Sequence, residues 1–232
     1  MLTSFYANAL DVKLVTGDNK PPYSDRSLYM NGISSLLASK VMQESKTTYS
    51  ISWRPWNRGL FETDTGVFDI AFPYSITRER VSKFYFSNPI YSINNVLIVP
   101  KSITDLRKYS SINTVKVCVP SHFSWSLLKK YSSSYRFQKV NANTEEDCTA
   151  LIKEKKVDII LTSKIKAKHL LKLEKPLIDY KISGFSLNIT NKYFLISKAN
   201  PNAKKILRQI NVSLEKLAAR GTYQSLISNY PL

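Results

Sequence analysis

Hydrophobic residues along the chain follow two spacings, one typical of strands and the other of helices. Asp11–Thr16 alternates polar and apolar residues and predicts a strand, and Asn31–Glu44 has apolar residues at helical spacing. The order then repeats, and the third strand is apolar throughout after Asp69, as in buried parallel strands. The further elements predicted here are strand Tyr49–Trp53, helix Trp56–Thr65 and strand Phe68–Pro73. Strands that alternate with helices predict an α/β lobe.

The alternation starts again beyond strand Val96–Pro100, which predicts a second α/β lobe. The expected elements are strand Val115–Val119, helix Phe123–Tyr131, strand Phe137–Val140, helix Glu145–Glu154, strand Val157–Thr162, strand Tyr193–Ser197, helix Asn202–Arg220 and helix Tyr223–Asn229. We expect one lobe over residues 100–190 and a discontinuous one over residues 10–95 and 197–232. The strands Val96–Pro100 and Tyr193–Ser197 are then the crossings, and we expect them to act as a hinge.

The formal charge of +17 raises the question of nucleic-acid binding, but its distribution argues against this. Residues 1–100 carry 10 basic and 8 acidic side chains, whereas residues 101–190 carry 17 and 8. The excess is mostly lysine along predicted helices, with no nucleic-acid recognition motif and no interleaved aromatic residues. We expect a solvated lysine-rich surface; a protein held near anionic membrane or wall surfaces is the alternative.

The first residues and the cysteines both indicate export. Ala7-Asn8-Ala9 is a small-x-small triplet of the kind that signal peptidase cleaves after, so residues 1–9 are interpreted as the remnant of an export signal. No apolar run approaches the roughly 18 residues that cross a membrane. Two cysteines in an exported chain predict a disulfide between Cys118 and Cys148, the alternative being two unrelated buried thiols.

Three stretches resemble the periplasmic solute-binding family that feeds polar amino acids to ABC importers. Thr16-Gly-Asp-Asn-Lys-Pro-Pro-Tyr23 is similar to the family's opening strand and ligand-facing loop. Gly66-Val-Phe-Asp through Ser75-Ile-Thr-Arg-Glu-Arg80, followed by Phe86-Ser-Asn-Pro-Ile-Tyr91, resembles its Gly-x-x-Asp strand, Ser/Thr-x-Thr-x-x-Arg turn and Phe-Ser-x-Pro-Tyr segment. The stretch that ends in Gly221-Thr-Tyr223 is close to its last helix. Together these stretches span nearly the whole chain in the family's order.

The resemblance implies an α/β, two-lobed clamshell of the type II periplasmic-binding-protein class, with two hinge strands. It implies a monomeric, periplasmic protein that captures a small carboxylated solute, an amino acid or a derivative, for an ABC permease in the inner membrane. No cofactor, metal or nucleic-acid partner is expected, and the protein is not expected to be an enzyme.

The resemblance also implies a role for Arg80, the family's anchor for the ligand's α-carboxylate. A guanidinium meets a carboxylate with two parallel, charge-assisted hydrogen bonds. Ser75 and Thr77 can contribute hydroxyl and backbone groups to the same carboxylate, or they cap the following helix. The aromatic residues that could line the ligand's apolar stem, or belong to the core instead, are Tyr23, Trp56, Phe72 and Tyr74.

The second lobe departs from the family's pattern. Ser121, His122 and Phe123 stand where relatives have a Gly-Ser/Thr-Thr turn, and they could still bind an anion at a helix start. Ser163 stands where relatives place the aspartate that holds the ligand's ammonium. A serine cannot neutralise an ammonium, so either another acid does so or the ligand is not a standard α-amino acid.

Two alternatives remain open at the level of sequence. The first is an enzyme on the same scaffold, since cyclohexadienyl dehydratases resemble these binding proteins. His122 would then be the acid that protonates the leaving hydroxyl. Turnover of prephenate or arogenate would test this hypothesis. The other alternative is a stand-alone ligand-sensing module without a transporter.

Overall fold

The chain divides into two compact units. The computed structural model describes residues 11–121, 123–129, 131 and 134–231. Unit 1 consists of Met1–Ser92 and Asn191–Leu232, and unit 2 of Ile93–Thr190. The chain passes between the units within two long strands, β5 (Tyr91–Pro100) and β9 (Tyr180–Ser197). The predicted remnant of an export signal, residues 1–9, lies outside the described residues.

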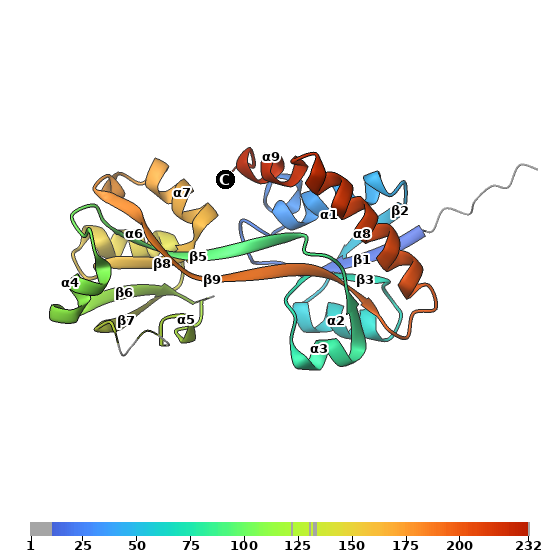
Figure 1. The fold of residues 1–232 in the computed structure, drawn as a ribbon, viewed down its shortest axis with the longest axis horizontal. Coiled ribbons are helices and arrows are strands. Elements are labelled where there is room, and N and C mark those ends of the chain that lie inside the picture. The colour runs from blue at the N-terminus through green and yellow to red at the C-terminus, as the bar shows by residue number, and fades with distance from the viewer. Residues whose placement is uncertain (1–10, 122, 130, 132–133, 232) are drawn as a thin grey trace, which may run out of the picture. The chain divides into compact units, whose positions relative to one another are not determined.

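The sheet of unit 1 places three parallel strands next to one antiparallel strand (Figure 1). β1 (Asp11–Thr16) pairs in parallel with β2 (Thr48–Trp53) and with β3 (Ile70–Tyr74), and the C-terminal part of β9 pairs antiparallel with β3. β4 (Phe84–Phe86) also pairs with β9. Every residue of β3 is buried, as its continuous apolar sequence predicts.

Helices cover both faces of this sheet. α1 (Ile33–Glu44), α8 (Ala203–Ala219) and α9 (Thr222–Ser228) pack together on one face (Figure 1). α2 (Trp56–Asp64) packs on the other, over a core that includes Val15, Phe68 and Leu195. α8 buries Ile206, Ile210 and Leu214, residues four apart that form one helical face.

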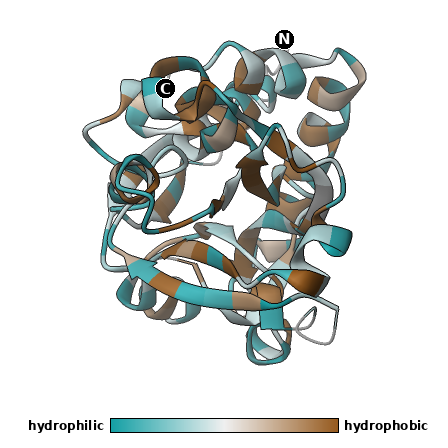
Figure 2. Cartoon of the chain, turned by 90° about the vertical axis from the view of Figure 1, so that its left-hand side faces the viewer, coloured by the Kyte–Doolittle hydropathy of each residue, from teal (hydrophilic) through white to brown (hydrophobic). Residues whose placement is uncertain are grey.

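Unit 2 repeats this plan with its own sheet and core. β6 (Val115–Pro120) lies in parallel between β7 (Phe137–Ala142) and β8 (Ile159–Ser163), and β5 pairs antiparallel with β8. Successive residues of β5 belong to two different hydrophobic clusters of unit 2. Val96 and Ile98 pack with residues of α6 (Glu145–Lys153) and α7 (Lys164–Leu173). Leu97 and Val99 face the side of α4 (Leu106–Ile112) and α5 (Ser126–Lys129). Figure 2 shows hydrophobic strands beside helices in which hydrophobic and hydrophilic residues alternate.

The same aspartate contact fixes the start of a strand in each unit. The Asp69 carboxylate accepts a hydrogen bond from the backbone N–H of Lys13 at 2.9 Å, just before β3. The Asp158 carboxylate accepts one from the backbone N–H of Lys116 at 2.7 Å, just before β8. Each aspartate therefore joins neighbouring strands at corresponding places, which accounts for the Asp of the Gly66-Val-Phe-Asp stretch and for Asp158 without a ligand.

The main differences from the sequence-based elements lie at boundaries and in irregular segments. β3 and β8 each begin two residues later than predicted, at Ile70 and Ile159, because the preceding aspartate is engaged with the neighbouring strand. The helix predicted over Phe123–Tyr131 is helical only over Ser126–Lys129 among the described residues. The hydroxyl of Ser124 accepts from the N–H of Ser126 at 3.2 Å, a local contact that competes with helix formation.

Some elements have no counterpart in the sequence-based interpretation. They are η1 (Tyr29–Asn31), β4, α4, η2 (Lys175–Leu177) and the N-terminal part of β9. Within the described residues, none of the helices combines the length and the apolar character needed to cross a membrane.

The predicted disulfide between Cys118 and Cys148 is confirmed. It joins β6 to α6 inside unit 2, and both cysteines are fully buried among residues such as Val96 and Ile160. The two residues are 30 positions apart. In the chain-entropy model such a loop stabilises the folded protein by about 3–4 kcal/mol.

We therefore expect the double substitution Cys118→Ala and Cys148→Ala to lower the free energy of unfolding of unit 2 by about 3 kcal/mol. Urea-induced unfolding followed by circular dichroism measures this. Reduction of the wild-type protein should give a similar loss, and a double variant as stable as the oxidised protein would contradict the prediction.

Candidate ligand-binding site

Arg80 lies in α3 (Arg78–Lys83) and is held in place by the residues just before it. The Thr77 hydroxyl accepts a hydrogen bond from the backbone N–H of Arg80 at 3.3 Å, so Thr77 caps the helix. The Arg80 Nη1 donates to the Ser75 carbonyl oxygen at 2.9 Å. Its guanidinium carbon lies 5.0 Å from the centre of the Tyr74 ring, within cation–π range. No carboxylate of the described chain forms an ion pair with Arg80, so its remaining N–H groups can serve a ligand.

Two of the predicted aromatic residues form one wall beside Arg80. The Tyr74 hydroxyl donates to the Trp56 carbonyl oxygen at 2.7 Å, and the two rings meet edge to face with centres 5.6 Å apart. The Trp56 Nε1 donates to the Asp18 carbonyl oxygen at 2.9 Å. These bonds tie β3, α2 and the loop after β1 together, so that the wall has a fixed position.

Two lysines that the sequence analysis did not single out join Arg80. Lys20, in the loop after β1, has its Nζ 4.5 Å from the centre of the Trp56 ring. Lys192, in β9, donates from Nζ to the Ser75 hydroxyl at 2.9 Å. We call Lys20, Arg80 and Lys192 the cationic cluster. Only the fold brings these residues together, because 172 positions separate the two lysines.

The electrostatics of the cationic cluster show that its charges are close and uncompensated. Partial burial lowers the pKa of Lys192 to about 8, and repulsion by Lys20 and Arg80 adds to the effect. The pKa of Lys20 is lowered by the same two causes, burial first and then Arg80. The side chain of Lys20 is exposed, whereas that of Lys192 is half-buried. Burial also raises the pKa of the Tyr74 hydroxyl to about 12, which keeps that group neutral.

The other two aromatic candidates of unit 1 lie in the interior. Phe72 has no exposed surface and packs against Phe194, with ring centres 5.7 Å apart. Its assignment to a ligand wall is therefore corrected to a core position, because β3 alternates its side chains between two buried faces. Tyr23 is largely buried and stacks on Tyr91 at 5.5 Å.

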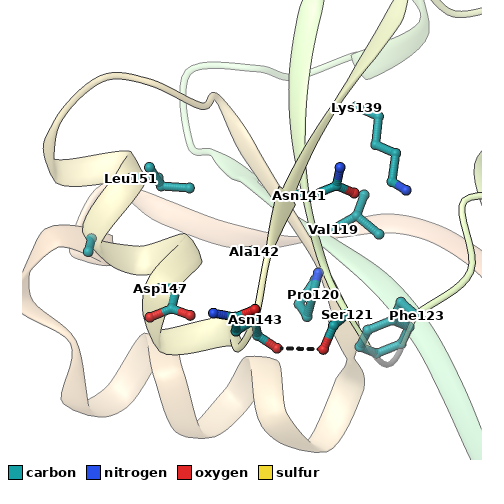
Figure 3. Close-up of a pocket in the computed structure, with 11 residues that line it drawn as sticks. Val119, Pro120, Ser121, Phe123, Lys139, Asn141, Ala142, Asn143, Asp147 and Leu151 are labelled. Atoms are coloured by element: carbon teal, nitrogen blue, oxygen red, sulfur yellow. Dashed lines mark hydrogen bonds between the residues drawn. The ribbon is translucent and has the colours of Figure 1, made fainter.

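In unit 2 the candidates Ser121 and Phe123 line a cavity of about 560 Å³ (Figure 3). Ser121 directly follows β6, and its hydroxyl donates to the Asn143 carbonyl oxygen at 3.0 Å. Lys139 and Asp147 supply opposite charges to the same cavity lining. The predicted site residue His122 lies outside the described residues.

Ser163 occupies the end of β8 and caps the helix that follows. It is buried, and its hydroxyl accepts from the backbone N–H of Lys166 at 3.3 Å. This local bond accounts for a serine at the start of α7. In the part of the chain that the structure describes, no group of three or more histidine, cysteine, aspartate or glutamate side chains could hold a metal ion.

The comparison with protein families decides the identity of the chain. Residues 12–231 match the model of bacterial extracellular solute-binding proteins, family 3. The chain belongs to this family. No match is found among curated protein sequences.

Solved structures share the fold of this family 3 chain at low sequence identity. Substrate-binding domain 2 of Lactococcus lactis GlnP, in an open conformation, has a TM-score of 0.76 at 13% identity, over 95% of this chain and 94% of that one. An ancestral cationic amino acid solute-binding protein gives 0.74 at 20% identity, over 95% of both chains. The amino acid ABC transporter substrate-binding protein AbpA of Streptococcus pneumoniae, bound to L-arginine, gives 0.61 at 19%, over 94% and 93%. The predicted α/β fold of type II periplasmic binding proteins is thereby confirmed.

The close approach of Gly17 to Trp56 yields a stability prediction. A Cβ on Gly17 would lie 2.2 Å from the Trp56 ring, so Gly17→Ala must displace that ring. We expect a loss of about 1–3 kcal/mol in the free energy of unfolding, as for other overpacked sites. Chemical unfolding measures it, with Gly184→Ala as the control because nothing lies within 4 Å of the Cβ added there. Equal stability of both variants would contradict the prediction.

The lowered pKa of Lys192 yields a prediction about pH. Its pKa is about 8 in the folded protein and 10.5 in the unfolded chain, so the unfolded state binds more protons between these values. The cost of the buried charge is therefore fully present below about pH 8 and is relieved as the pH rises toward about 10. Lys192→Met should melt at a higher temperature than wild type at about pH 7, and the difference should shrink at about pH 9. A difference that does not change with pH would contradict this origin.

Proposed function

We propose that this chain captures a small carboxylated solute, an amino acid or a related compound, and delivers it to an ABC permease without chemical turnover. The observation that carries the proposal is the Arg80 guanidinium, which Ser75 and Tyr74 position while no protein carboxylate of the described chain neutralises it. Membership of the solute-binding family supports the same role. AbpA, which shares the fold, holds L-arginine.

The position of Arg80 within unit 1 supports ligand binding. The loop with Lys20 follows the carboxyl end of β1, and the segment from Ser75 to Arg80 follows that of β3. In open α/β sheets, ligands bind outside the carboxyl ends of the parallel strands. The partly exposed Trp56 ring supplies an apolar surface in this region, and the buried Tyr74 supports it and contacts the guanidinium. Small-molecule sites combine such surfaces with a few placed polar groups.

The proposal also includes the oligomeric state of the protein, its location and its ligand contacts in unit 2. The protein acts as a monomer outside the cytoplasmic membrane, in the periplasm. Ser121, His122, Phe123 and Ser163 are proposed ligand contacts of unit 2, and single alanine substitutions can test each of them.

Loss of Arg80 should abolish solute binding. A thermal-shift screen against amino acids, polyamines, small organic acids and short peptides identifies a solute that stabilises the wild type. A ligand at 100 times its dissociation constant adds about 2.7 kcal/mol of stability. Arg80→Ala should lose this stabilisation, because it removes the charge and both hydrogen bonds offered to the carboxylate.

Arg78→Ala is the matched control, because Arg78 is an exposed arginine two positions away on the same helix. It should bind like wild type. Stabilisation of Arg80→Ala by the same carboxylated solute, or stabilisation of the wild type only by amines that lack a carboxylate, would overturn Arg80 as the anchor.

A further inference from the structure

We infer that the solute of this chain is a small dicarboxylate whose two negative charges are both held on unit 1, one by Arg80 and the other by Lys20 and Lys192. This inference rests on the proposed function and adds the charge of the ligand to it. It is carried by the convergence of three cations from three separate segments on one apolar wall.

The cationic cluster carries more positive charge than one carboxylate can neutralise. The single negative charge of one carboxylate is matched by one guanidinium, which donates two parallel hydrogen bonds to it. Around Arg80, however, the structure places two further cations, Lys20 and Lys192. One carboxylate would leave much of this positive charge without a partner.

Two acidic side chains that lie near Lys20 or Trp56 in the sequence already have basic partners in unit 1. Asp18 is the carboxylate nearest in sequence to Lys20, and it pairs with Arg26 at 2.6 Å. The Glu62 carboxylate, on the helix that begins at Trp56, pairs with Arg54 and Arg58. Neither lysine of the cluster takes part in an ion pair within the described residues, so a bound anion can supply their counter-charge.

Ser75 contacts two of the three cations. Its carbonyl oxygen accepts from Arg80 Nη1, and its hydroxyl accepts from Lys192 Nζ, each at 2.9 Å. Each cation uses one N–H on Ser75 and keeps others for an anion. Lys20 lies over the Trp56 ring, a contact with no negative charge of its own. The cluster thus combines three cations with an apolar wall, a combination that suits a short carbon chain with anionic groups.

Binding of an anion should also change the protonation of Lys192. In the free protein Lys192 faces Lys20 and Arg80, and its pKa is about 8. A bound anion replaces this repulsion by attraction and raises the pKa. At about pH 8 a fraction of the molecules must then take up a proton when the solute binds. A zwitterionic amino acid with one carboxylate, held by Arg80, would produce a smaller uptake.

The experiment compares matched ligands that differ in one charge. Isothermal titration calorimetry with L-glutamate and L-glutamine, and with succinate and succinamate, gives the affinities. We expect the diacid of at least one pair to bind about ten-fold or more tightly than its monoamide, about 1.4 kcal/mol. Titration of that diacid at about pH 8, in two buffers of different ionisation enthalpy, should show proton uptake.

Variants then assign the charges. Lys20→Met and Lys192→Met should each weaken the diacid about ten-fold and change the monoamide much less, and Lys192→Met should also abolish the proton uptake. Lys205→Met is the control, because it removes the same charge from an exposed position of α8. It should leave binding unchanged.

The outcomes separate this inference from the proposed function. If monoamides bind as tightly as diacids and Arg80→Ala still abolishes binding, the carboxylate-binding function stands and the dicarboxylate inference fails. If inorganic phosphate binds and the diacids do not, the inference also fails. If no carboxylated solute binds at all, the proposed function fails as well.

Discussion

Ser75 holds two positive charges close together, and the properties of the proposed site follow from this contact. Its carbonyl oxygen accepts a hydrogen bond from Arg80 and its hydroxyl accepts one from Lys192. Partial burial of Lys192 lowers its pKa to about 8, and repulsion by the neighbouring positive charges of Lys20 and Arg80 adds to this effect. The arrangement costs free energy in the unliganded protein, and an anion that binds there recovers it. The proposed anchor, the proposed charge of the ligand and the expected response to pH therefore depend on the same cluster of charges.

The fold places this contact by repeating one plan in each unit. In unit 1 the segments after β1 and β3 carry Lys20 and Arg80, and in unit 2 Ser121 and Ser163 stand at the ends of β6 and β8. Parallel strands present their carboxyl ends at one edge of a sheet, where loops can differ without disturbing the core. The aspartates that precede β3 and β8 fix neighbouring strands in the same way. The two sheets thus share a framework, and the loops that follow their parallel strands carry different residues.

Parts of the site could be predicted because their determinants are local. Thr77 caps the helix of Arg80 three residues before it, and both belong to one continuous motif. The disulfide could be expected because only two cysteines were available in a chain with signs of export. The sequence left Phe72 open between a ligand wall and the core, since an aromatic residue in a buried strand has no local feature that separates the two roles, and the structure places it in the core. The shortened α5 reflects a serine contact that competes with the apolar spacing.

The sequence by itself determined the α/β alternation and the family, and it indicated Arg80 as the proposed anchor, because periodicity and short motifs act over a few residues. Only the tertiary structure decided that Lys20 and Lys192 join Arg80. The pairing of β9 with β3 brings Lys192 to Ser75, and the loop after β1 brings Lys20 over Trp56. No local pattern marks a lysine that will share a site with another 172 positions away. The field that acts on each charge depends on distances that exist only after the sheet has formed.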